Sequence, residues 1–301
     1  MLQSFSYKAK SEVCRAVVQR LCCSRAECYG VLLYCNTFTP GEVRIITENP
    51  EFAGRLSKLF NRAFGIHFDR VPEDLEASKL IFQITDREKM TKIINTLGYD
   101  PKQSLVAHVN FGMLEDECCR TAFLRGAFLA GGSVTDPEKR YHLELATAHQ
   151  QASREVSALL VEMGFLPHTV LRGGNSVIYF KQSEHIEDFL TTIGAPAAAT
   201  DIMTAKVDKS IRNGANRAAN CDIANVNKTI NASESQITAI GRLRLEGKLE
   251  KLPEKLKETA DLRLEFPELS LQQLAEKHEP PLTKSCLNHR LRKIMELAGK
   301  E

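Results

Sequence analysis

Two pairs of adjacent cysteines are the first residues in the sequence whose types suggest chemistry. They are Cys22-Cys23 and Cys118-Cys119, and both pairs lie inside helical patterns among apolar residues. Thiolates bind zinc and react with oxidants, but neighbouring side chains on a helix point about 100° apart, so a single pair chelates zinc poorly. No CxxC spacing occurs in the sequence, and reactive thiols need an exposed, electropositive setting. We therefore predict reduced structural thiols, with no metal and no cofactor.

A basic amphipathic helix near the end of the sequence carries the second group of candidate residues. Thr283 is its predicted N-cap, and apolar side chains recur after it at helical spacing. Two helices are predicted before it: one starts with Pro253 at its first position, and one is capped by Ser270 with Gln273. Helix, helix, turn and basic helix is the plan of a helix-turn-helix, whose second helix enters the DNA major groove. The predicted DNA-binding residues are Lys284, Ser285, Asn288, His289, Arg290, Arg292 and Lys293.

The residue types on this helix indicate different contacts. Asn288 is predicted to read adenine, and Arg292 or Lys284 to read guanine or bind a phosphate. Arg290 and Lys293 are assigned to phosphate contacts or to packing, and His289 to a hydrogen bond or a phosphate. The alternative is an ordinary basic helix with one solvated face.

The distribution of charge favours a polyanionic partner. The net charge is only +2, but residues 203–228 and residues 281–301 each hold five basic and two acidic residues. Each segment therefore carries +3, and the rest of the chain carries −4. Residues 201–232 are predicted to be a basic helical connector with a break at Asn213-Gly214, or a solvated linker with no ligand. Further candidate DNA contacts on it are Arg212, Asn216, Arg217 and Lys228.

Composition places the chain among soluble globular proteins. It has 301 residues, of which 43% are apolar and 26% are charged. No apolar run approaches the roughly 18 residues of a membrane span, and the first residues do not resemble a secretory signal. We expect a cytoplasmic, nucleoid-associated protein without a membrane partner.

An internal repeat organises the first 200 residues. At an offset of 96 positions, Cys22–Asn36 aligns with Cys118–Gly132, and Lys79–Gly98 aligns with Ser176–Gly194. Each half is predicted to run helix, strand pair, helix, strand, helix; a chance match of apolar positions is the alternative. The predicted fold is α+β: pseudo-two-fold halves at residues 1–100 and 101–200, then an all-α helix-turn-helix domain at residues 233–301.

Small residues recur in the first helix of each half, predicted at about 24–36 and 118–131. Gly30 aligns with Gly126, and Ala130 follows one turn later. Glycine inside a helix costs roughly 0.5–1 kcal/mol relative to alanine, so its presence in both copies needs a packing reason. We predict that the two helices pack against each other through these residues.

The stretch FLRGAFLAGGSV, Phe123–Val134, resembles the LAGLIDADG helix of homing endonucleases. The resemblance implies two such helices, each ending in an acidic residue that holds a divalent metal for DNA cleavage. This sequence has Cys35 and Gly131 at those places, and neither binds Mg²⁺, so we expect no catalytic residue and no enzyme activity. The alternative is a metal-dependent endonuclease with displaced acids, Asp136 or Glu144.

A wider resemblance covers the whole chain. Together with LAGGSV, the stretches GANRAANCDIANVNKTINAS (Gly214–Ser233) and KSCLNHRLRKI (Lys284–Ile294) resemble the WhiA family of DNA-binding regulators of mainly Gram-positive bacteria. The resemblance implies a degenerate LAGLIDADG domain, a helix-turn-helix and double-stranded DNA as the partner. It also implies transcription regulation linked to sporulation, cell division or chromosome segregation, with another transcription or division factor as a further partner. The remaining alternative is a protein-interaction module with an accessory DNA-binding domain.

Overall fold

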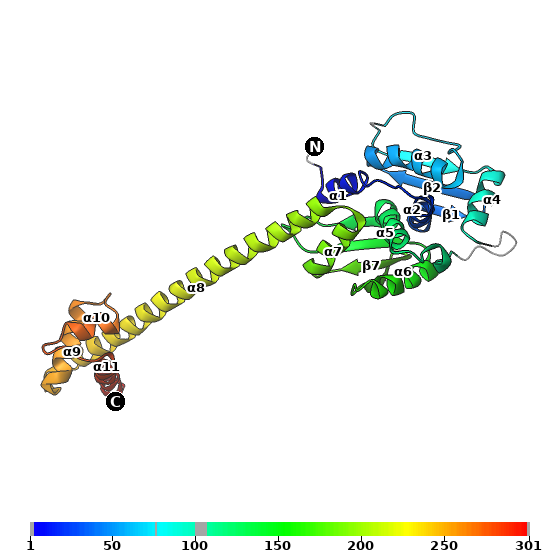
Figure 1. The fold of residues 1–301 in the computed structure, drawn as a ribbon. Coiled ribbons are helices and arrows are strands. Elements are labelled where there is room, and N and C mark those ends of the chain that lie inside the picture. Colours follow the sequence, from blue (N-terminus) through cyan, green and yellow to red (C-terminus); the bar gives the residue numbers. More distant parts are fainter. Residues whose placement is uncertain (1–2, 76, 100–106, 300–301) are drawn as a thin grey trace. The chain divides into compact units, whose positions relative to one another are not determined.

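The computed structural model describes residues 3–75, 77–99 and 107–299, which form two compact units (Figure 1). Unit 1 extends to Lys209, and unit 2 begins at Ser210. The predicted boundary between the two halves, at residues 100 and 101, lies outside the described residues. Among the described residues, no helix is long and apolar enough to pass through a membrane.

The first half of unit 1 has the predicted order of elements, preceded by one further helix. Asn49 caps α3 by accepting a hydrogen bond from the backbone N–H of Phe52 at 3.0 Å, and Gly65 ends that helix at a φ of 63°. The three strands form an antiparallel sheet in the order β1-β2-β3. The elements are α1 (Phe5–Val13), α2 (Leu21–Tyr34), β1 (Thr37–Thr39), β2 (Glu42–Thr47), α3 (Pro50–Phe64), β3 (Leu80–Ile84) and α4 (Arg87–Thr96).

The second half repeats this order and adds one strand. Strand β6 forms a hairpin with β7 through Gly173 and Gly174, whose φ values of 57° and 83° suit a two-residue turn. The sequence predicted a single strand here. In the described part of the first half, the counterpart is an isolated bridge between Arg70 and Gln83 of β3. The sheet order is β4-β5-β7-β6. The elements are η1 (Phe111–Met113), α5 (Glu117–Gly131), β4 (Gly132–Val134), β5 (Leu143–Thr147), α6 (Gln150–Glu162), β6 (His168–Arg172), β7 (Asn175–Phe180) and α7 (Ser183–Ile193).

Helices α2 and α5 pack side by side and join the two halves (Figure 1). A Cβ added to Gly30 would lie 2.0 Å from the backbone oxygen of Phe123, and a Cβ added to Gly126 would lie 2.0 Å from that of Glu27. Phe123 and Glu27 are themselves 96 positions apart, so the two close approaches are related by the repeat. Ala130, which lies one turn further along, is partly buried against the same core.

A buried ion cluster lies at this helix pair. The carboxylate of Glu27 is fully buried and accepts hydrogen bonds from Arg55 on α3 at 2.6 and 2.9 Å, while Arg125 on α5 lies 3.4 Å away. Burial acts against the charge of Arg55, but Glu27 raises the pKa of that guanidinium above its ordinary value. Arg55 also donates to the carbonyls of Cys14 and Ala16, so the cluster fixes the segment after α1 as well.

Glu27→Gln is expected to lower the free energy of unfolding of unit 1 by about 3–5 kcal/mol, because two largely buried guanidinium groups lose their counter-charge. The measurement is urea unfolding followed by tyrosine fluorescence. All six tyrosines lie between Tyr7 and Tyr179 and the chain has no tryptophan, so the signal reports unit 1 alone. Glu51→Gln is the control: its pair with Arg15 is exposed and 3.7 Å long, and its loss should cost less than about 1 kcal/mol. Equal effects of the two substitutions would contradict this account.

Unit 2 is helical and has a core of its own. Helix α8 begins in unit 1 and remains helical through Asn213-Gly214, so the predicted break is wrong. A lone glycine costs a helix only about 1 kcal/mol, which the flanking turns offset. The elements are α8 (Pro196–Leu245), η2 (Leu249–Lys251), α9 (Glu254–Glu265), α10 (Leu271–Glu276) and α11 (Lys284–Ala298).

Side-chain caps start α10 and α11. Ser270 and Gln273 form the predicted capping box of α10, and Thr283 caps α11 by accepting from the backbone N–H of Cys286 at 3.2 Å. The sequence predicted Pro253 at the first position of α9, but in the structure Pro253 is the N-cap of that helix. A turn with a cis Glu279–Pro280 bond joins α10 to α11.

Candidate nucleic-acid interface

The exposed face of α11 gathers most of the predicted DNA-binding residues. Its opposite face is buried in the core of unit 2 through Leu287, Leu291 and Ile294. Lys284, Asn288 and Arg292 recur every four residues, so they form one stripe along the helix. Asn288 is half-buried, and the exposed candidates are Lys284, Ser285, His289, Arg292 and Lys293.

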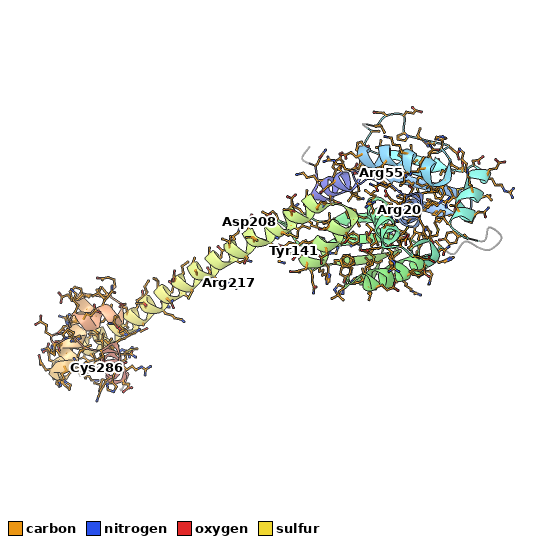
Figure 2. The ribbon with its side chains drawn as sticks, viewed as in Figure 1. Arg20, Arg55, Tyr141, Asp208, Arg217 and Cys286 are labelled. Carbon is orange, nitrogen blue, oxygen red and sulfur yellow. The ribbon has the colours of Figure 1, made fainter. Side chains whose placement is uncertain are left out.

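A hollow of 240 Å³ within unit 2 adjoins the start of this helix. Lys284 of α11 and Lys228 of α8 both line it, together with Gln272 of α10. Among the candidate DNA contacts on the predicted connector, Lys228 is the one that lines this hollow beside α11. The other connector candidates lie on the exposed surface of α8, where Arg217 donates to the carbonyl of Asn213 at 3.2 Å (Figure 2). They are Arg212, Asn216 and Arg217.

Gly131 and Cys35 are the two positions that the LAGLIDADG resemblance aligns with metal-binding acids. A Cβ on Gly131 would lie 2.4 Å from the backbone oxygen of Ala146 and 3.0 Å from that of Tyr34. Cys35 is buried, its thiol lies within hydrogen-bond distance of the carbonyls of Leu32 and Thr37, and burial raises its pKa to about 12. Neither position offers a charged oxygen to a metal ion.

The displaced acids are engaged elsewhere. Asp136 accepts from the backbone N–H of Glu138 at 2.9 Å within a turn. Glu144 accepts from Arg172 at 2.8 and 2.9 Å, and His142 lies 3.2 Å from it. Burial opposes the effect, but Arg172 and His142 hold the pKa of Glu144 below its ordinary value. Within the described part of the chain, the only cluster of metal-ligand side chains consists of cysteines and includes no carboxylate.

Comparison with known proteins identifies the family of this chain. The family model of the WhiA C-terminal HTH domain matches residues 215–298, and the family model of the WhiA LAGLIDADG-like domain matches residues 120–212. The probable cell division protein WhiA of Ruminiclostridium cellulolyticum is 38% identical over 307 residues, covering 98% of this chain and 97% of that protein. The chain belongs to the WhiA family. The protein of the same name in Alkaliphilus metalliredigens is 34% identical over 311 residues, covering 99% of this chain and 98% of its own.

Solved structures of WhiA proteins have the same fold. The crystal structure of full-length DUF199/WhiA from Thermatoga maritima covers 98% of both chains at 23% identity, with a TM-score of 0.60. The N-terminal LAGLIDADG domain of DUF199/WhiA covers 64% of this chain and 94% of its own at 18% identity, with a TM-score of 0.51. The prediction of a LAGLIDADG-like α+β domain followed by a helix-turn-helix is thus confirmed.

One predicted DNA contact of this WhiA-family chain points inward. Arg290 donates to the carbonyl of Lys255 at 3.1 Å and to the hydroxyl of Thr259 at 3.4 Å, and it lies 3.7 Å from the carboxylate of Glu258. All three partners are on α9. These contacts show that Arg290 holds α11 against α9, and its phosphate contact stays a prediction.

Arg263 is a structural residue of the WhiA helix-turn-helix that the sequence analysis missed. It is 2% exposed and donates to the carbonyl of Leu269 at 2.8 Å, which closes the end of α9 and fixes the segment leading to α10. Burial lowers the pKa of its guanidinium. A basic residue in the last helical turn is the signal that was available for it.

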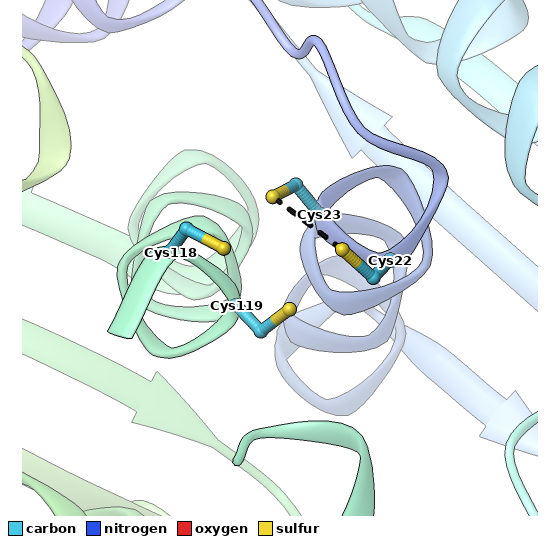
Figure 3. Close-up of side chains that lie close together, drawn as sticks. All are labelled: Cys22, Cys23, Cys118 and Cys119. Carbon is cyan, nitrogen blue, oxygen red and sulfur yellow. Dashed lines mark hydrogen bonds between the residues drawn. The ribbon is translucent and has the colours of Figure 1, made fainter. Parts of the chain in front are cut away.

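The two cysteine pairs meet in the LAGLIDADG-like unit. Figure 3 shows the thiols of Cys22 and Cys23 on α2 directed toward those of Cys118 and Cys119 on α5. All four Sγ atoms lie within 4.8 Å of one another. The sequence analysis considered each pair alone, whereas the same 96-residue offset that pairs Gly30 with Gly126 also brings the cysteines together.

Proposed function

We propose that this chain is a sequence-specific, DNA-binding transcription regulator. The observation that carries the proposal is the exposed basic face of α11, which includes the half-buried amide of Asn288, on a helix whose opposite face is buried in the helix-turn-helix core. In this motif the residues near the start of the second helix reach base edges. Asn288 offers an amide to adenine, and Arg292 and Lys284 offer cations to guanine or phosphate.

The regulated process is cell division. Relatives that match this chain over nearly its whole length are named as probable cell division proteins. The family resemblance also favours roles in sporulation and chromosome segregation, and it favours a Gram-positive bacterium as the source of the protein. Binding of double-stranded DNA makes the protein nucleoid-associated, and the LAGLIDADG-like unit adds a DNA-backbone surface or a surface for another transcription or division factor.

The LAGLIDADG-like unit has lost the cleavage chemistry, and the protein is not a nuclease. This part of the proposal rests on the closed position at Gly131, on the buried thiol of Cys35 and on the pairing of Glu144 with Arg172. Hydrolysis by two metal-bound carboxylates needs oxygen ligands that these positions do not supply.

Gel retardation and plasmid cleavage with the pure full-length protein test both parts together. We expect retardation of promoter fragments, weakening steeply with salt because several phosphates are neutralised, and no cleavage of supercoiled plasmid with Mg²⁺. Cleavage that disappears in Asp136→Asn or Glu144→Gln would establish the endonuclease alternative. Binding that does not depend on salt would contradict the proposed interface.

A further inference from the structure

We propose that Cys22, Cys23, Cys118 and Cys119 bind one zinc ion as a tetrathiolate site at the beginning of the two packed helices. This site is separate from the proposed DNA interface and does not depend on it. Its role is structural, because four protein ligands leave zinc no open position for a substrate.

The spacing of the thiols fits a single ion. A tetrahedral site with Zn–S bonds of about 2.3 Å places its sulfur atoms about 3.8 Å apart. The Sγ atoms of Cys22 and Cys23 are 4.0 Å apart, and all four lie within 4.8 Å of one another. An iron–sulfur cluster would hold irons and sulfides between the cysteines and would require wider separations.

The pairing across helices removes the geometric objection to adjacent cysteines. One pair alone cannot surround an ion, because its two side chains diverge around the helix. Here each helix supplies two ligands, and the two pairs approach the same space from opposite sides (Figure 3).

Positive charge near the helix starts partly offsets the cost of burying thiolate ligands. Binding of Zn²⁺ by four thiols releases four protons, changes no oxidation state and leaves a net charge of −2. Helix α2 begins at Leu21 and α5 at Glu117, so both pairs lie in a first helical turn, where the helix dipole is positive. Arg20 adds a full positive charge, with its guanidinium nitrogen 3.9 Å from the Sγ of Cys118. Asp116 and Glu117 flank the site with the opposite sign.

The four cysteines differ in exposure, so an ion can enter the site from solvent and still be held partly within the core. Cys23 and Cys119 are buried, Cys118 is half-buried, and Cys22 is exposed to solvent. The ion would join α2 to α5, and thus one half of the repeat to the other, at the helix ends that precede the crossing at Gly30 and Gly126.

Metal analysis of the full-length wild-type chain, purified under reducing conditions and without added metal, tests the proposal. We expect about one equivalent of zinc per chain, and replacement by Co²⁺ should give the thiolate charge-transfer and visible bands of a tetrahedral site. Removal of the zinc by a chelator should lower the unfolding temperature of unit 1, which is measured by tyrosine fluorescence. A wild-type chain that holds no zinc and gives no such bands with Co²⁺ would overturn the proposal, as would disulfides that lower its mass by two hydrogens each.

The variant Cys22→Ser/Cys118→Ser removes one ligand from each helix. It is expected to lose at least about tenfold in zinc content. The matched control is Cys221→Ser/Cys286→Ser, which removes two exposed thiols of unit 2 and should keep the full equivalent. Unchanged zinc in the first variant would also overturn the proposal. If that variant fails to fold, the wild-type measurements still decide the question.

Discussion

Gly126→Ala is expected to lower the free energy of unfolding of unit 1 by about 3 kcal/mol or more. The added Cβ would lie 2.0 Å from the backbone oxygen of Glu27 and 2.9 Å from the backbone nitrogen of Val31. Backbone atoms of α2 cannot yield without moving the whole helix, so α2 and α5 would have to separate. Gly30→Ala should have a similar effect, because its Cβ would lie 2.0 Å from the backbone oxygen of Phe123.

Gly54→Ala is the matched control for both substitutions. Gly54 lies in α3 of the same unit, and a Cβ there would meet nothing within 4 Å. This substitution should therefore stabilise unit 1 by about 0.5–1 kcal/mol through helix propensity. Urea unfolding followed by tyrosine fluorescence measures all three variants. The double variant of Gly30 and Gly126 should lose less free energy of unfolding than the sum of the two single losses, because both substitutions disrupt the same helix crossing. If Gly126→Ala is tolerated as well as Gly54→Ala, the close crossing does not hold the halves together.

Replacing Asn288 and Arg292 by alanine together is expected to weaken binding to specific DNA about 30-fold or more, since each base contact contributes about 1–3 kcal/mol. Binding to random DNA should fall much less, because the phosphate contacts predicted for Lys284 and Lys293 would remain. Fluorescence anisotropy with a bound promoter site and with a scrambled site, at one fixed salt concentration, measures the ratio of the two affinities.

Arg290→Ala is the control for the loss of a charge from α11. Arg290 is on the same helix but donates to the carbonyl of Lys255 and the hydroxyl of Thr259 on α9. Its removal should destabilise unit 2 and leave the ratio of specific to random binding unchanged. A fall in that ratio as large as with Asn288 and Arg292 would mean that α11 does not read the bases.

Local signals predicted much of the fold. The capping box of Ser270 and Gln273 and the N-cap of Thr283 depend only on neighbouring residues, and both helices begin as predicted. The paired strands also follow the repeat: Phe82 and Ile178, aligned by the 96-residue offset, both face buried partners in β2 and β5. Strand β6 was missed because every residue in it is exposed, so it has no apolar alternation to detect.

In the candidate sites, too, contacts between residues far apart in the sequence could not be predicted. The apolar stripe of α11 identified its exposed face from sequence, but nothing local distinguished Arg290 from Arg292, because the partners of Arg290 are about 30 positions away on α9. The cysteine cluster depends on a contact between α2 and α5, which only the packed structure supplies. The spacing within one cysteine pair therefore could not predict that the four thiols lie together.

Mapping the chromosomal sites of the protein in its own cells, as the intact chain and as Asn288→Ala at equal abundance, tests the central claim most directly. We expect the intact protein to occupy discrete sites that share a sequence and lie at promoters, and the variant to lose these sites while remaining on the chromosome. An unchanged set of sites in the variant would contradict sequence reading by α11 and would leave the protein without the function proposed for it.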